Sequence, residues 1–187
     1  MAKEKPANQV TTGKVRFSYV HIFEKHAFDS DPSKEQYSLC VLIPKDDKKT
    51  LASIARAIET AKEIGKPKMW DNKIPAKLWN PLRDGDEEHP EDEAFEGHYF
   101  LNAKSNTKPG IVDRNLERIL DPEEVYSGCY GRVSLTFFPF NSAGNRGVGV
   151  GLNNVQKVAD GERLGGRSNA EDDFEEYDDE DIDDLLG

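Results

Sequence analysis

The chain has 187 residues, with 25 Lys and Arg residues against 36 Asp and Glu residues, a net charge of -11 and 36% hydrophobic residues. This composition fits one modest globular domain with solvated segments and excludes most multidomain enzymes. The apolar runs are far shorter than the roughly 20 residues that cross a bilayer. Residues 1–6 lack the apolar stretch of a secretory signal. The isolated Cys40 and Cys129 indicate a cytosolic protein with reduced thiols and no cysteine zinc site.

The first two strands are predicted near the N-terminus. Residues 1–12 are polar and are expected to form a flexible N-terminus. Residues 15–23 are β-branched and aromatic and partly alternate, which is typical of a strand. The sequence around Pro32 interrupts this pattern. Apolar side chains at every second position of residues 37–43 then predict a second strand that Pro44 ends, and the two strands are expected to pair.

One helix is predicted, over residues 48–65. Apolar side chains recur there at three- and four-residue spacing, which indicates an amphipathic helix. Asp46 or Asp47 is the expected N-cap. Gly65 is expected just beyond the last helical residue, and Pro67 is expected to prevent the helix from continuing.

The middle of the chain combines a basic segment, an acidic segment and a strand. Residues 66–83 contain five basic residues, one acidic residue and both tryptophans. Residues 84–97 begin Asp-Gly-Asp and have no apolar period, so they predict an exposed loop. Strand-like sequence resumes at residues 98–103, and a turn separates it from a short strand at residues 111–112.

The clearest predicted strand covers residues 129–140, and its two faces differ in character. Its odd-numbered positions are mostly apolar and predict a core face. Its other face is polar but also carries three aromatic side chains and one arginine: Tyr130, Arg132, Ser134, Thr136, Phe138 and Phe140. A turn over residues 141–147 leads to a final strand that reaches about residue 159, in which Gly147, Gly149 and Gly151 leave room for close backbone approach.

Five or six strands with one substantial helix predict a mainly β domain over residues 13–160. An OB-type β-barrel with long loops fits this pattern, and a sandwich with one helix remains open. Residues 161–170 contain three glycines and one serine and predict a linker. Residues 171–187 are too acidic to bury a core and predict a disordered tail.

The acidic tail accounts for the whole net charge. Residues 171–187 hold 11 acidic residues and no basic ones, so the rest of the chain has 25 of each sign. Residues 84–96 hold eight more acidic residues, and the remaining body is therefore basic by about 8 charges. A basic body with an acidic end indicates a protein that binds a polyanion and carries a polyanion mimic. A solubilising tail on a neutral domain is the alternative.

The sequence does not favour metal or nucleotide chemistry. Its four histidines do not form an H-E-x-x-H motif, and the glycines at 147, 149 and 151 lack the continuation of a nucleotide-binding loop. The carboxylates at 84–96 do not have calcium-loop spacing. No cofactor, no metal and no enzymatic activity are therefore expected.

The mixture of basic and aromatic residues favours binding of single-stranded nucleic acid, in which cations follow the phosphates and flat side chains stack on bases. For the aromatic residues, core packing is the alternative. The predicted nucleic-acid-binding residues are Arg16, Tyr19, Lys73, Lys77, Trp79, Arg83, Lys104, Arg114, Tyr130, Arg132 and Phe138.

The tail mixes apolar side chains with its acids. A polyanion tethered near a basic groove is expected to compete with nucleic acid for that groove, and the apolar side chains offer partner proteins a contact. The residues predicted for these two roles are Asp172, Asp173, Phe174, Tyr177, Asp181, Ile182, Leu185 and Leu186.

Several motifs resemble, in order, a family of bacteriophage single-stranded DNA-binding proteins. They are Trp-Asn-Pro-Leu-Arg-Asp-Gly-Asp at 79–86, Tyr-Phe-Leu-Asn-Ala-Lys-Ser at 99–105, Asp-Pro at 121–122 with Val-Tyr-Ser-Gly at 125–128, and Gly-Leu-Asn-Asn-Val-Gln-Lys at 151–157 with Asp-Gly at 160–161. The resemblance covers about residues 12–166. It implies an OB fold, sequence-independent DNA binding in phage replication and recombination, and an acidic tail that tempers binding and recruits replication proteins. This tail ends Leu-Leu-Gly, where some related phage proteins end in an aromatic residue.

We therefore expect a non-enzymatic protein that binds and protects single-stranded DNA in the cytoplasm of the bacterial host. Its expected partners are single-stranded DNA and replication or recombination proteins, with no membrane partner and with a homo-oligomer left open. A virion or assembly protein with a solubilising tail is the leading alternative. A nuclease that uses the carboxylates at 84–96 is the third.

Overall fold

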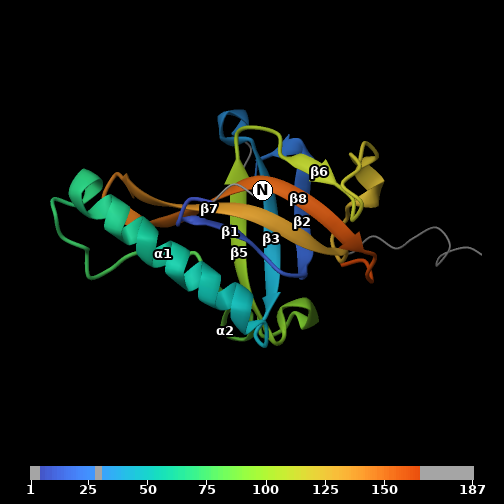
Figure 1. Ribbon diagram of the computed structural model, residues 1–187, viewed down its shortest axis with the longest axis horizontal. Helices are drawn as coiled ribbons and strands as arrows, with labels where there is room; N and C mark the ends of the chain where they lie inside the picture. The colour runs from blue at the N-terminus through green and yellow to red at the C-terminus, as the bar shows by residue number, and fades with distance from the viewer. Residues whose placement is uncertain (1–4, 28–30, 165–187) are drawn as a thin grey trace, which may run out of the picture.

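The computed structural model describes residues 5–27 and 31–164 (Figure 1). Five strands pair in the order β2, β3, β5, β8 and β7, and β7 pairs again with β2, so the pairings close a ring. Their bounds are β2 Val15–His26, β3 Gln36–Pro44, β5 His98–Ser105, β7 Tyr130–Ser142 and β8 Asn145–Ala159. This is the strand order of an OB fold. The prediction of a mainly β, OB-type domain with one substantial helix is confirmed.

The ring is weakly closed at two places. β2 pairs with β7 at two positions, and β5 pairs with β8, in parallel, at only one. Three short strands extend the sheet: β1 (Gln9–Thr11) on β7, β4 (Arg83–Asp84) on β5 and β6 (Gly110–Val112) on β8. The strands therefore form a ring that is not a complete barrel.

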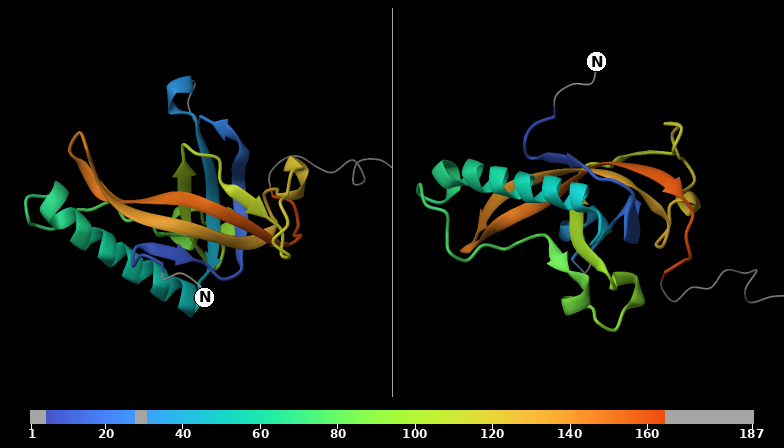
Figure 2. Two further views of the ribbon diagram at one scale, coloured as in Figure 1. Left: turned by 45° about the horizontal axis from the view of Figure 1, so that its top comes forward. Right: turned by 60° about the horizontal axis from the view of Figure 1, so that its bottom comes forward.

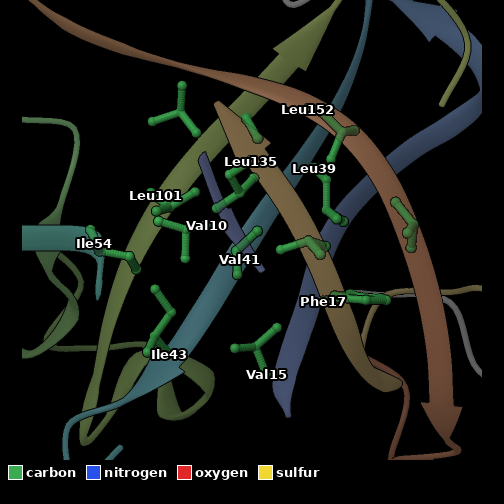
Figure 3. Packing of buried hydrophobic residues seen from close by; sticks show 14 of the residues in the cluster. Val10, Val15, Phe17, Leu39, Val41, Ile43, Ile54, Leu101, Leu135 and Leu152 are labelled. Atoms are coloured by element: carbon green, nitrogen blue, oxygen red, sulfur yellow. The ribbon is translucent and has the colours of Figure 1, made fainter. Parts of the chain in front are cut away.

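The core lies inside this ring. Side chains from β2, β3, β5, β7 and β8 converge there, as Figure 3 shows for Phe17, Val41, Leu101, Leu135 and Leu152. Each of these side chains is at most 3% exposed, as the alternation of inward and outward side chains along the strands requires.

β3 is buried on both faces, whereas the sequence pattern predicted only one apolar face. The outward-facing Cys40 and Leu42 pack against Phe95 and Phe100 in a second, smaller cluster. The two cysteines, Cys40 and Cys129, are buried free thiols, and burial raises the pKa of Cys40 to about 12.

The helix α1 (Lys48–Met69) begins as predicted, because the Asp47 side chain accepts a hydrogen bond from the Thr50 N–H at 3.2 Å. Its buried face, which includes Ile54 and Ala61, packs against β7 and β1. Figure 2 shows α1 lying along the β7–β8 hairpin, with the segment between α1 and β4 running back beneath that hairpin.

The predicted end of α1 is wrong, because the helix continues through Gly65 and Pro67 to Met69. A Cβ atom at Gly65 would stand 2.6 Å from Cβ of Pro139 and 3.0 Å from the ring of Trp70. Gly65 is therefore required by close packing of the helix and not by a left-handed turn. Trp70 caps the helix, and its N–H donates to the Gly65 carbonyl at 3.2 Å.

Two segments are more ordered than the sequence suggested. The N-terminal residues 9–11 form β1, in which Val10 is buried. Residues 84–97 contain the helix α2 (Gly85–Glu88) and a 3-10 turn (Glu93–Phe95), and they are not simply an exposed loop. The reason is Phe95, which is buried and lies edge-on against Phe100 at 5.1 Å between ring centroids.

The β7–β8 hairpin confirms the predicted alternation. Val133 and Phe137 are buried, while Arg132 and Phe138 are exposed. Strand pairing reaches Ser142, the last residue of β7, and Asn145, the first residue of β8. The turn is therefore shorter than predicted and has only two central residues, Ala143 and Gly144, with φ values of 49° and 86°. Two central residues with positive φ are typical of a tight hairpin turn.

The end of the described chain also differs from the prediction. Residues 161–164, expected as the start of a linker, pack against the domain. The predicted tail at 171–187 lies outside the described residues. Within residues 5–27 and 31–164, no helix is both long and apolar enough to cross a membrane.

Candidate nucleic-acid interface

An open groove of about 1320 Å³ runs across the outer face of β3 and β5 to the β7–β8 hairpin, and residues 77–83 form one of its sides. Four basic side chains line it, and no carboxylate does so among the described residues. The four basic residues are Lys77, Arg83, Lys104 and Arg146. The groove is therefore positively charged within a protein whose net charge is negative.

Three aromatic side chains in the groove are largely open to solvent. Tyr19 is 56% exposed, Trp79 is 51% exposed and Phe138 is 42% exposed. Three exposed rings in one groove suit stacking on the bases of a single strand. The buried Phe95 and Phe100 form part of the groove floor.

Backbone hydrogen bonds hold Trp79 at the groove. Its N–H donates to the Arg146 carbonyl at 2.9 Å, and its carbonyl accepts from the Val148 N–H at 3.1 Å. A Cβ atom at Gly147 would stand only 2.5 Å from Cβ of Trp79, so the glycine permits this approach. The indole thus points outward from a backbone that β8 holds in place, while Trp70 is the tryptophan that packs in the interior.

Arg83 lies between two aromatic rings. Its guanidinium carbon is 5.0 Å from the ring centroid of Trp79 and 5.2 Å from that of Phe100. Its Nε also donates to both carboxylate oxygens of Glu88, at 2.8 and 2.9 Å. These contacts fix the plane of the guanidinium beside an exposed indole. The guanidinium is placed to contact a phosphate, and the indole is placed to stack on the adjacent base.

Tyr19 enters the groove because β2 contains a bulge. The register of β2 against β3 shifts between Ser18 and His21, and Tyr19 has a φ of 47°. A bulge redirects a side chain, and positive φ at a non-glycine residue costs on the order of 1–3 kcal/mol. The strained backbone therefore orients an exposed aromatic ring into the groove.

Phe138 stands over a glycine of the neighbouring strand. A Cβ atom at Gly149 would be 2.6 Å from the Phe138 ring. The predicted close backbone approach is thus found at Gly147, which meets the Trp79 backbone, whereas Gly149 makes room for a side-chain ring. At Gly151 the nearest atom would be 3.6 Å away, which is ordinary contact.

Six of the eleven predicted nucleic-acid-binding residues line the groove, and they come from four separate segments of the chain. These six are Tyr19, Lys77, Trp79, Arg83, Lys104 and Phe138.

Arg16 and Tyr130 lie at the other end of β7 from Phe138. Eight residues along a strand span about 27 Å, so Arg16 and Tyr130 lie far from Phe138 and are not among the residues that line the groove. The Arg16 guanidinium lies 5.4 Å from the Tyr130 ring centroid and donates to the carbonyls of Gly128 at 3.1 Å and Glu162 at 2.7 Å.

The remaining three predicted residues also lie outside the groove. Arg132 donates from Nε to the Thr12 carbonyl at 2.9 Å. Lys73 lies in the turn after α1, and Arg114 lies in the turn after β6. A sequence-based count of basic residues could not separate these from the groove lysines.

Several groove residues are not among those predicted from the sequence. Arg146 lies in the hairpin, and Phe140 lines the groove beside it. Along β5, Phe100, Asn102 and Lys104 share the outer face, and of these only Lys104 is among the predicted residues. Applying the period of two to this strand would have found the other two.

The acidic segment next to the groove is used to hold the fold together. Nζ of Lys45 lies 2.8 Å from Asp84 and 2.7 Å from Asp86. The hydrogen bond from Lys45 lowers the pKa of each of these carboxyls. A Cβ atom at Gly85 would be 2.6 Å from the Phe95 carbonyl oxygen, which explains the glycine between the two aspartates. In the described part of the chain, no three His, Cys, Asp or Glu side chains are placed to share a metal ion.

Comparison with known proteins points to phage proteins. The protein p50 of Acyrthosiphon pisum secondary endosymbiont phage 1 is 29% identical over 181 residues, which cover 91% of this chain and 93% of p50. The solved structure of the single-stranded DNA-binding protein of bacteriophage Enc34 in complex with single-stranded DNA has a TM-score of 0.74 at 23% identity, covering 87% of this chain and 97% of that chain.

The fold is also similar to that of gp2.5, a single-stranded DNA-binding protein encoded by bacteriophage T7. That structure has a TM-score of 0.59 at 17% identity and covers 88% of this chain and 91% of its own. Residues 8–186 match the model of the family described as the single-stranded DNA-binding protein of Enterobacter phage Enc34. Because this match spans most of the chain, the protein belongs to that family of phage single-stranded DNA-binding proteins.

Proposed function

We propose that the protein binds single-stranded DNA in the groove, without sequence preference and without catalysis. The observation that carries this proposal is the groove itself, which combines four basic residues and exposed aromatic rings with no carboxylate among its described lining residues. In this arrangement the cations follow the phosphates. Bases stack on Tyr19, Trp79 and Phe138, at about 1–3 kcal/mol for each base.

The absence of sequence preference follows from the type of contact. Every base has a face that can stack on a ring, whereas sequence readout requires hydrogen bonds directed at particular base edges. A duplex keeps its base faces stacked on each other, so the exposed rings of the groove favour a single strand. The related Enc34 protein, whose structure contains single-stranded DNA, supports this proposal.

The proposed biological role is the protection of single strands during phage replication and recombination in the host cytoplasm. The acidic tail at 171–187 would compete with DNA for the groove and recruit replication or recombination proteins through its apolar residues. The complementary charges support competition: the tail has 11 acidic residues, and the groove has four basic ones.

Fluorescence anisotropy with labelled oligo-dT, oligo-dA and duplex DNA over a salt series tests this function. We expect tight binding to both single strands and weaker binding to duplex. If all four groove cations contact phosphates, the plot of log affinity against log salt concentration should have a slope of about -3, and with fewer contacts it should be shallower. A chain ending at Ala170 should bind more tightly. Unchanged or weaker binding by that chain would contradict tail competition, and no binding by either chain would favour a virion or assembly protein.

A further inference from the structure

The five residues after β8, 160–164, form what we call the strap, and the domain holds them at several points. The Asp160 carboxylate accepts hydrogen bonds from the Tyr126 hydroxyl at 2.9 Å and from Nζ of Lys157 at 2.7 Å. The Gly161 N–H donates to the same hydroxyl at 3.2 Å. The first part of the strap is therefore tied to the turn that precedes β7.

The second part of the strap crosses from Arg16 toward β3. Nη2 of Arg16 donates to the Glu162 carbonyl at 2.7 Å, and the Leu164 N–H donates to the Ser127 carbonyl at 2.8 Å. A Cβ atom at Gly128 would stand 2.0 Å from the Glu162 carbonyl oxygen, so the domain surface is shaped to receive this backbone.

The strap ends beside the groove. The Leu164 side chain packs against the cluster that contains Cys40, Phe95 and Phe100, and these three residues also line the groove. The described chain therefore ends against a cluster that also forms part of the groove lining. Glu171, the first acidic residue of the tail, is seven residues beyond Leu164, and seven residues reach at most about 25 Å.

We propose that the strap, clamped by Arg16, fixes the origin of the acidic tail at the end of the groove and thereby sets how strongly the tail competes with DNA. This inference rests on the proposed function. It makes Arg16 a positioning residue and not a DNA contact, because two backbone carbonyls and the Tyr130 ring already engage its guanidinium. Releasing the strap moves the origin of the tail back to Ala159 and lowers the effective concentration of the tail at the groove.

The test uses Arg16→Met, Leu164→Ser and the double variant, each in the full chain. The same variants are made in a second background, in which the 11 acidic residues of 171–187 are replaced by Asn and Gln. Affinity for oligo-dT is measured by anisotropy, and the rate of trypsin cleavage after Arg163 reports directly on whether the strap is released.

We expect cleavage after Arg163 to accelerate in both backgrounds. In the full chain, affinity should rise about two- to fivefold, as expected for a tether that is longer and starts farther from the groove. In the neutral-tail background, the same variants should leave affinity unchanged. The gain in the full chain should not depend on protein concentration, since the competing tail belongs to the same molecule.

Lys14→Met is the matched control. Nζ of Lys14 lies 5.1 Å from the centroid of the same Tyr130 ring, so the variant loses the same charge at the same place. No hydrogen bond or ion pair joins Lys14 to the strap within the described residues. We expect no gain in affinity from Lys14→Met and no faster cleavage.

Four results would overturn the inference. Weaker binding of Arg16→Met in both backgrounds would make Arg16 a DNA contact. Faster cleavage with no tail-dependent gain would show that the strap does not set competition, and unchanged cleavage in the double variant would show that these residues do not hold it. A gain that varies with protein concentration would assign the competing tail to a second copy. Failure of the parent chains to bind DNA in either background would instead refute the proposed function.

Discussion

Trp79 illustrates how one residue acquires a role from its backbone partners. Its main chain pairs with Arg146 and Val148 of the β7–β8 hairpin, and its ring is left 51% exposed beside Arg83. Tyr19 and Phe138 reach the same groove by other means, a strained bulge and a glycine opposite the ring. At the scale of the residue, an exposed ring combined with a fixed backbone is what distinguishes a stacking residue from a core residue.

Replacing Trp79 with Ala should therefore weaken binding to oligo-dT by roughly 5- to 150-fold, which corresponds to the loss of about 1–3 kcal/mol of stacking. The melting temperature should change little, because the backbone pairing needs no side chain. Anisotropy and thermal melting measure the two effects. Trp79→Phe should retain most of the affinity, and Leu120→Ala, which removes another exposed side chain outside the groove, should retain all of it. Equal affinity of Trp79→Ala and the parent chain would contradict stacking at this position.

At the scale of the element, the groove depends on how α1 and the hairpin hold each other. Gly65 lets α1 approach Pro139 of β7, and Gly147 lets residues 77–83 approach β8. The helix does not line the groove, but it supports the hairpin that does. Glycines at these two contacts therefore determine the shape of the groove without contributing a side chain to it.

Gly147→Ala should push the Trp79 segment away from β8, because the added Cβ atom would stand 2.5 Å from Cβ of Trp79. We expect a several-fold loss of oligo-dT affinity and a fall in melting temperature of about 2–4 °C, as for a destabilisation of 1 kcal/mol in a domain of this size. The matched control is Gly151→Ala, where the nearest atom would be 3.6 Å away. If both variants bind DNA equally well, the close approach at Gly147 does not shape the groove.

At the scale of the whole molecule, the net charge of -11 conceals how the charge is distributed. Acidic residues of the 84–97 segment pair with Lys45 and with one groove cation, Arg83, and the tail holds 11 more acidic residues. The groove lining itself has four basic residues and no acidic one among the described residues. The protein thus separates its charges in space. That separation allows one molecule to contain both a polyanion-binding groove and a competitor for it.

The Lys45 pairs predict a pH dependence of stability. The hydrogen bond from Lys45 lowers the pKa of Asp84 and of Asp86 below its unfolded value. Their contribution to the free energy of unfolding is therefore present above about pH 4 and is lost as the pH falls through the folded-state pKa. The melting temperature of Lys45→Met should be lower than that of the parent chain near neutral pH, and the difference should shrink below about pH 4. A difference that stays constant down to about pH 2 would contradict this coupling.

Much of the fold followed from local pattern. The start of α1 at Lys48, the two faces of β7 and the mainly β class depend on spacing and capping within short segments, and the structure confirms them. The motifs between residues 79 and 161 were also sufficient to recognise the family. The end of α1 was missed because Gly65 and Pro67 are helix-ending residues in local terms, and only contact with Pro139 and Trp70 explains why the helix continues.

By itself, the sequence determined the class of fold, the family and the uneven distribution of charge, because each depends on residue order or composition. Only the tertiary structure decided which of two tryptophans is exposed, which basic residues share a groove and why Arg16 faces the strap. These depend on contacts between segments far apart in the chain, such as Trp79 with Gly147 and Arg16 with Glu162. Composition and periodicity cannot specify which distant segments meet, because that choice is made by the pairing and packing of the whole domain.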